Sequence, residues 1–142
     1  MFQVKITGMK ELKQNMDAVI KELEDAMEGG TQEAADYAEG IVRRNTPVGP
    51  TGNLQAAVTT KPLPRKKGYP PNTMVGLDYN IAPHQHLVEF GTAPRYHASG
   101  KSVGAHPKPA NPFFRTSIDQ AKAGIKGRIG DSAKSVIDRR RG

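Results

Sequence analysis

The segment that decides how this chain folds reads HQHLVEFGTAPRYHASGKSVGAHPKPANPFFR and runs from His84 to Arg115. It begins with an apolar group at 87–90 and ends with an asparagine–proline pair followed by two phenylalanines. The residues between the two ends follow neither a helical nor a strand period. Long segments of this kind are uncommon inside compact domains and usually bind something or stay disordered. The chain is therefore expected to be a small scaffold that displays a long arm.

The residues before position 46 predict a strand and two helices. Phe2, Val4 and Ile6 alternate with polar residues, which is typical of a short half-buried strand. A first helix is expected from Met9 to Met27 and should stop at the glycine pair 29–30, and a second should begin at a Thr31 cap and end at Thr46-Pro47. The apolar stripe of the first helix is expected to pack in the core. It consists of Met9, Leu12, Met16, Val19, Ile20, Leu23 and Met27.

Short strands are expected over 54–92. Residues 54–60 alternate as a strand does, with Leu54 on the apolar face, and the proline-rich, basic segment 61–72 indicates an exposed connector. Residues 74–77 and the region around Ile81 are further candidate strands. The run 87–90 fits either a strand or a single helical turn, because it is too short for its period to decide.

A last helix is expected over 112–138. Asn111 can cap it and Pro112 suits the first helical position, and apolar residues follow at helical spacing. Three glycines weaken this helix, so a break is expected near Gly130, with Asp131 capping a final turn.

Together these elements predict one α+β domain over residues 1–142. Its small, mostly antiparallel sheet should be packed by two N-terminal helices and one C-terminal helix, with a long extended loop. The parts are a strand and two helices in 1–45, the sheet in 54–92, an extended basic arm in 93–111 and the C-terminal helix in 112–138.

Composition narrows the possible functions. The chain has no cysteine, which excludes disulfides and thiolate metal sites. It shows neither a signal peptide nor a run of 18 apolar residues, so a soluble protein made in the cytoplasm is expected. Residues 1–40 carry a net charge of −5 and residues 41–142 a net charge of +12. This asymmetry indicates contact with nucleic acid, head-to-tail contact between copies, or basic residues that merely solvate loops.

Candidates for catalysis are few. His84 and His86 could share one face of a strand, and Glu89, His97 or His106 could complete a metal site, but the spacing lacks the fixed frame of a helical zinc motif. The chain contains no serine-nucleophile elbow and no glycine-rich phosphate loop. No enzymatic activity and no cofactor are expected.

Glu89 and the basic clusters have structural or binding interpretations. A carboxylate among apolar residues is costly unless it is paired, so Glu89 is expected to form a structural or intersubunit salt bridge with Arg95 or Arg115. The basic clusters could contact phosphates nonspecifically, although they match no nucleic-acid-binding motif. They are Arg65, Lys66 and Lys67 with Tyr69, Arg95 with Tyr96, and Arg139 to Arg141.

The order of these pieces resembles a known family. Thr46-Pro47 followed by Thr51-Gly52-Asn53-Leu54, then His86-Leu87-Val88-Glu89-Phe90-Gly91-Thr92, then Asn111-Pro112-Phe113-Phe114-Arg115 is similar to the neck or tail-completion (head–tail joining, minor tail) proteins of long-tailed bacteriophages. The resemblance covers roughly residues 1 to 130. The segment between Gly91 and Pro112 is longer and more basic than expected of that family.

The resemblance implies a structural virion protein without catalytic activity. It implies a ring of copies, a hexamer rather than a dodecamer, that contacts adaptor, stopper, tail terminator or tail tube proteins, with nonspecific DNA contact in the lumen and no membrane contact. The alternative is a basic DNA-binding protein that contacts phosphates nonspecifically. The residues expected to form the scaffold, the contact arm and its anchors are Leu54, Leu87, Glu89, Phe90, Gly91, Thr92, Arg95, Tyr96, Lys101, Lys108, Phe113, Phe114 and Arg115.

Overall fold

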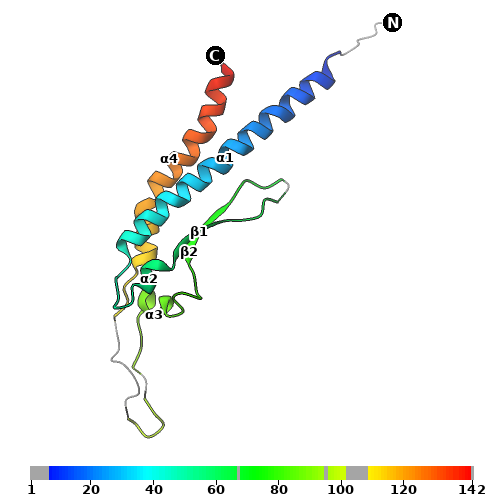
Figure 1. Cartoon of the computed structure of the whole chain (residues 1–142). Helices are drawn as coiled ribbons and strands as arrows, with labels where there is room; N and C mark the ends of the chain where they lie inside the picture. The colour runs from blue at the N-terminus through cyan, green and yellow to red at the C-terminus, as the bar shows by residue number, and fades with distance from the viewer. Residues whose placement is uncertain (1–6, 67, 95, 102–108, 142) are drawn as a thin grey trace.

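The computed structural model describes residues 7–66, 68–94, 96–101 and 109–141, and it has an α+β architecture (Figure 1). Two long helices lie side by side, and a two-stranded sheet and two short helices pack at one end of the pair. The elements are α1 (Met9–Asn45), α2 (Asn53–Ala56), β1 (Val58–Pro62), β2 (Thr73–Leu77), α3 (Gln85–Phe90) and α4 (Phe113–Arg141). The strand expected at positions 2–6 lies outside the described residues.

The N-terminal region forms one helix, so the prediction of two helices was wrong. α1 continues through Gly29 and Gly30 and ends at Asn45, with Thr46 as its C-cap. Thr31 lies inside the helix and its hydroxyl donates to the carbonyl of Glu28. Gly30 is buried, and a Cβ there would lie 2.7 Å from the Cβ of Ser132 on α4. The packing of α4 at this point compensates for the roughly 1 kcal/mol that a helical glycine costs.

The last helix is also continuous. α4 runs from Phe113 to Arg141 without the break expected near Gly130, and it ends three residues beyond the predicted boundary. It begins at Phe113, one residue after the predicted first helical position at Pro112. Contact with α1 along its length gives the glycine-rich stretch a support that local propensity alone does not supply.

The sheet is a single antiparallel hairpin. β1 pairs with β2 in the register Val58↔Leu77 to Pro62↔Thr73, which confirms the strand expected at 74–77. The strand predicted over 54–60 was wrong in its first half, because Leu54 lies in α2 and pairing begins only at Val58. No strand forms around Ile81, where Asp78 instead accepts a hydrogen bond from the backbone N–H of Asn80 and closes a turn.

Small residues bring α1 and α4 close together. Ala38 and Ile41 of α1 form a core cluster with Ala121 of α4, and the ring of Tyr37 packs directly over Gly124. A second cluster lies at the lower end of the pair, where α2, β2, α3 and the first turn of α4 meet (Figure 1). The core is therefore divided between a helix–helix seam and the junction that holds the arm.

The charge asymmetry of the sequence appears in the structure as a difference in net charge between α1 and α4. α1 carries nine acidic and five basic residues, whereas α4 carries three acidic and eight basic residues. Ion pairs of 2.7 and 3.5 Å join Glu22 of α1 to Arg140 and Arg139 of α4. Part of the asymmetry is thus paired within one chain, a use of the charges that the sequence interpretations did not include.

The apolar stripe of α1 is not core along its first half. Met9, Leu12 and Met16 are more than half exposed, and Val19 and Ile20 are also exposed, so the prediction that the whole stripe packs inside was wrong. Only Leu23 and Met27, which lie alongside α4, are half-buried. The reason is length, because α1 extends beyond the end of α4 and no other described element covers it (Figure 1).

Candidate functional site

The arm leaves and returns to the scaffold at one joint. The apolar run 87–90 lies in the helix α3. Of the two predicted alternatives for this run, a strand or a helical turn, the helical turn is the one that the structure contains. Gly91 ends α3 with φ 76° and ψ −179°, a conformation open essentially to glycine alone. At the far end of the arm, the N–H of Asn111 donates to the carbonyl of Val88 at 3.0 Å. The two ends of the arm are thus fixed against each other.

The side chain of Glu89 connects α3 to the first turn of α4 at this joint. Its carboxylate accepts hydrogen bonds from the backbone N–H groups of Phe114, at 2.9 Å, and Arg115, at 3.2 Å. These groups belong to the first turn of α4, whose N–H groups have no partner within the helix and whose dipole favours a negative charge. Among the described residues, Glu89 thus acts as a helix cap, and Arg115 is its partner through the backbone N–H and not through a salt bridge. The predicted pairing with Arg95 lies outside the described residues.

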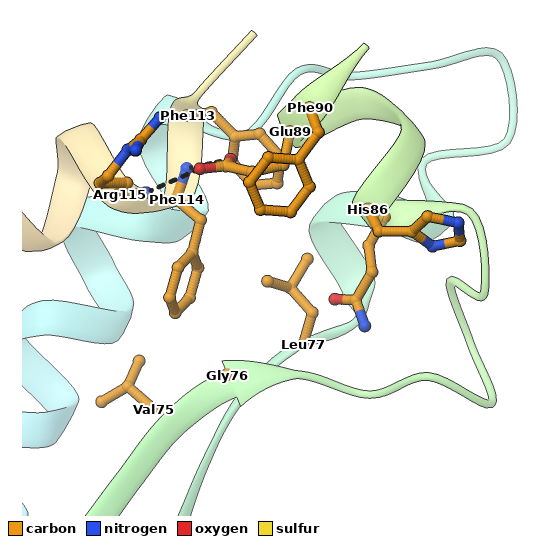
Figure 2. Close-up of a pocket in the computed structure, with 10 residues that line it drawn as sticks. Val75, Gly76, Leu77, His86, Glu89, Phe90, Phe113, Phe114 and Arg115 are labelled. Atoms are coloured by element: carbon orange, nitrogen blue, oxygen red, sulfur yellow. Dashed lines mark hydrogen bonds between the residues drawn. The ribbon is translucent and has the colours of Figure 1, made fainter. Parts of the chain in front are cut away.

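An apolar pocket of about 500 Å³ opens beside the joint (Figure 2). Val75 and Leu77 of β2 face the ring of Phe114, and the ring of Phe90 stands over the opposite side. Phe113 also lines the pocket and is buried, whereas Phe90 is 71% exposed. The remaining lining residues are Gly76, Gln85, His86, Glu89 and Arg115.

The predicted anchors fall into a buried and an exposed group. Leu54 and Phe113 are buried in one cluster with Val88 and Phe114 packed against it, as expected of anchors. Phe90 was expected to be part of the scaffold that anchors the arm, but its side chain is exposed and lies outside this cluster. Because successive helical residues turn by 100°, Val88 faces the core from α3 while Phe90 points outward. Leu87 is half-buried and the side chain of Arg115 is exposed.

The described part of the arm presents polar and aromatic side chains. Tyr96 is 67% exposed and Lys101 is exposed, while Thr92 is half-buried beside Gly91. A turn forms at 97–101, where the N–H of His97 donates to the carbonyl of Lys101 at 2.7 Å. Arg95 and Lys108 lie outside the described residues.

The candidate metal ligands are not arranged as the strand interpretation required. His84 precedes the first residue of α3 and His86 is its second residue, so the two rings do not share a strand face. Within the described ranges, no group of three or more histidine, aspartate or glutamate side chains is placed to hold a metal ion. His106 lies outside those ranges.

Two of the three basic clusters face acidic partners. The guanidinium group of Arg65, in the hairpin loop, pairs with Glu24 of α1 and lies 3.8 and 3.9 Å from carboxylate oxygens of Asp25 and Glu28. Arg139 and Arg140 pair with Glu22, as described above. Lys67 and Arg95 lie outside the described residues. These pairings leave fewer basic groups available for phosphates than the sequence suggested.

The sequence interpretation missed the residues that connect the scaffold to α1. The guanidinium of Arg43 donates to the carbonyls of Gln55, at 3.1 Å, and Val58, at 2.6 Å, and pairs with Glu39 at 2.5 Å. The amide of Asn45 donates to the hydroxyl of buried Ser117 on α4 at 3.1 Å. No local pattern marks these residues, because their partners are distant in sequence.

Comparisons of the chain with protein-family models, with curated proteins and with solved structures found no match. In the described part of the chain, no helix combines the length and apolar character needed to cross a membrane.

Proposed function

We propose that this chain is a structural, non-catalytic protein of a tailed-phage neck or tail. It would form a ring of copies, six rather than twelve, that joins or completes the head–tail connection in the virion. Its partners would be the neighbouring adaptor, stopper, tail terminator or tail tube proteins. The sequence resemblance suggests this role, and the arrangement of the arm supports it.

The joint between the two motifs is the observation that carries the proposal. The first motif, VEFGT, covers residues 88–92 and the second, PFFR, covers residues 112–115. They are 20 residues apart in sequence, yet Glu89 of the first motif caps the helix that begins in the second. The two ends of the arm are therefore held together, and its described residues 96–101 lie away from the two long helices (Figure 1). An anchored, exposed loop is suited to lie on a neighbouring protein while the scaffold keeps its own fold.

Phage particles made with and without the protein test this role directly. Filled heads and complete tails should accumulate separately when the protein is absent and join when it is added back. A variant with Tyr96→Ala and Lys101→Ala should fold normally and fail to restore joining. The matched control, Tyr79→Ala with Lys126→Ala, removes an exposed tyrosine and lysine elsewhere and should restore it. Normal particles in the absence of the protein would contradict the proposal.

The alternative of nonspecific DNA binding predicts a different measurement. DNA retention by the purified protein should then fall steeply as salt rises, because released counterions drive such binding. The ion pairs of Arg65, Arg139 and Arg140 with acidic residues of α1 count against this alternative. A ring in electron micrographs with no affinity for DNA would exclude it.

A further inference from the structure

The N-terminal part of α1 is a helix without a partner among the described elements. We define the free segment as residues 9–20, all of which are exposed. The C-terminal end of α4 reaches α1 only as far as Glu22, where Arg139 and Arg140 pair with it. The free segment therefore extends beyond α4 (Figure 1), over about 18 Å at 1.5 Å per residue.

The apolar stripe of the free segment continues a seam that α4 already fills. Met9, Leu12, Met16 and Val19 are spaced by three, four and three residues, and the same spacing leads on to Leu23, Ala26 and Gly30. Gly30 touches Ser132 of α4, and Leu23 and Ala26 are half-buried between this contact and the ion pairs of Glu22. A regular three–four spacing is the pattern of a seam between paired helices. The free part of the seam therefore fits a helix that runs antiparallel to α1, in line with α4.

We propose that a second copy of this chain supplies that helix. The two free segments would pair antiparallel about a two-fold axis near Gln14. The spacing of the stripe is symmetric about this residue, so Met9 of one copy would face Val19 of the other, and Leu12 would face Met16. A two-fold contact requires a surface that is complementary to itself, and this symmetry satisfies the requirement. The proposal does not depend on the function proposed above.

Charge and length both favour a second copy. Lys10 and Lys13 balance Glu11 and Asp17, so the free segment is neutral in a chain of net charge +7. Contact between two free segments therefore brings no net charge repulsion. In the proposed register, residues 9–19 of one copy lie along residues 19–9 of the other. Each α4 then ends where the other copy's free segment begins, so the stripe is covered without a collision of the two α4 helices.

The expected contact is weak because it is short. A pair of helices of this length buries less area than a standard protein interface, so a weak, reversible association is expected. Sedimentation velocity of the full chain over a concentration series should show a shift from monomer to dimer. A mass that stays monomeric at all concentrations would overturn the proposal.

Paired variants identify the surface. Leu12→Glu with Met16→Glu should weaken the association at least tenfold without lowering the melting temperature, because both side chains are exposed in the monomer. Gln14 lies level with the two-fold axis but on the face of the helix opposite the stripe, so Gln14→Glu with Ala18→Glu adds the same charge away from the contact and should leave the association unchanged. An association that resists the stripe variant would show that the copies meet elsewhere and would also overturn the proposal.

Single cysteines test the register, since the chain has none of its own. A mixture of Leu12→Cys and Met16→Cys chains should form a disulfide-linked heterodimer on mild oxidation. Linked homodimers of Leu12→Cys alone would indicate a parallel pair and contradict the proposed arrangement. The two proposals can fail separately. If the Leu12→Glu, Met16→Glu variant still forms a ring, the head–tail proposal stands without the dimer. If the protein does not join heads to tails but still forms the dimer, the dimer proposal stands.

Discussion

The carboxylate of Glu89 accepts a hydrogen bond of 2.9 Å from the backbone N–H of Phe114, 25 residues further along the chain. A second bond, from the N–H of Arg115, makes this one side chain the cap of a 29-residue helix. A side chain in the last turn of α3 thus also caps the start of α4. The arm between the two positions is held by the scaffold.

Removal of this cap should destabilise the protein. Glu89→Ala leaves the first N–H groups of α4 without their acceptor, and we expect a loss of about 1–2 kcal/mol in the free energy of unfolding. Glu89→Gln keeps one acceptor oxygen and should cost less. Urea denaturation followed by circular dichroism measures both. Glu33→Ala, at an exposed position of α1, is the control and should change stability by less than about 0.5 kcal/mol. Equal effects at 89 and 33 would contradict the capping role.

Two glycines of α4 should respond in opposite directions to the same substitution. A Cβ at Gly124 would lie 2.7 Å from Cζ of Tyr37, so Gly124→Ala should push the helices apart and cost about 1–3 kcal/mol. Gly127 has no atom within 4 Å of an added Cβ, so Gly127→Ala should stabilise the protein by about 0.5–1 kcal/mol. Thermal melts of the two variants compare them directly. Stabilisation by both substitutions would show that Tyr37 can move away at little cost.

The guanidinium fork of Arg43 should not be replaceable by an ammonium group. It joins α1 to the carbonyls of Gln55 and Val58 and pairs with Glu39 at the same time. Arg43→Lys keeps the charge but loses the fork, and we expect a loss of about 1–2 kcal/mol. Arg44→Lys, at the exposed neighbouring position, should be nearly neutral. Chemical denaturation of the two variants is the measurement, and equal stabilities would contradict the fork's role.

The ion pairs of Glu22 should make stability depend on pH. The hydrogen bond from Arg140, supported by the charges of Arg140 and Arg139, lowers the pKa of Glu22 below its usual value of 4.5. A lowered pKa in the folded state stabilises the protein above the unfolded-state pKa, and the contribution disappears as the pH falls through the lowered value. Glu22→Gln should therefore be less stable than the natural chain at pH 7, and the difference should shrink below about pH 4.5. A difference that is constant from pH 7 to pH 3 would contradict this assignment.

Local sequence patterns predicted the element types well where one pattern dominated. The hairpin strand expected at 74–77 and the end of α1 at Asn45 match, because turn residues act within a few positions. The start of α4 is one residue later than predicted, and the side chain that caps it is Glu89, whereas the local pattern indicated Asn111. The same local signals failed at Gly29-Gly30 and Gly130, where both helices continue. A glycine costs a helix about 1 kcal/mol, and contact with another helix can outweigh that cost.

The sequence by itself determined that this is an α+β chain with a long arm between two apolar motifs, and it singled out Glu89 as a carboxylate in need of a partner. Only the tertiary structure decided that this partner is the backbone of α4, that Phe90 faces outward and that the first half of the α1 stripe is exposed. The physical reason is that apolar spacing marks which side chains can share a face. Whether that face is covered depends on elements far away in the chain, and here α4 ends before it reaches residues 9–20.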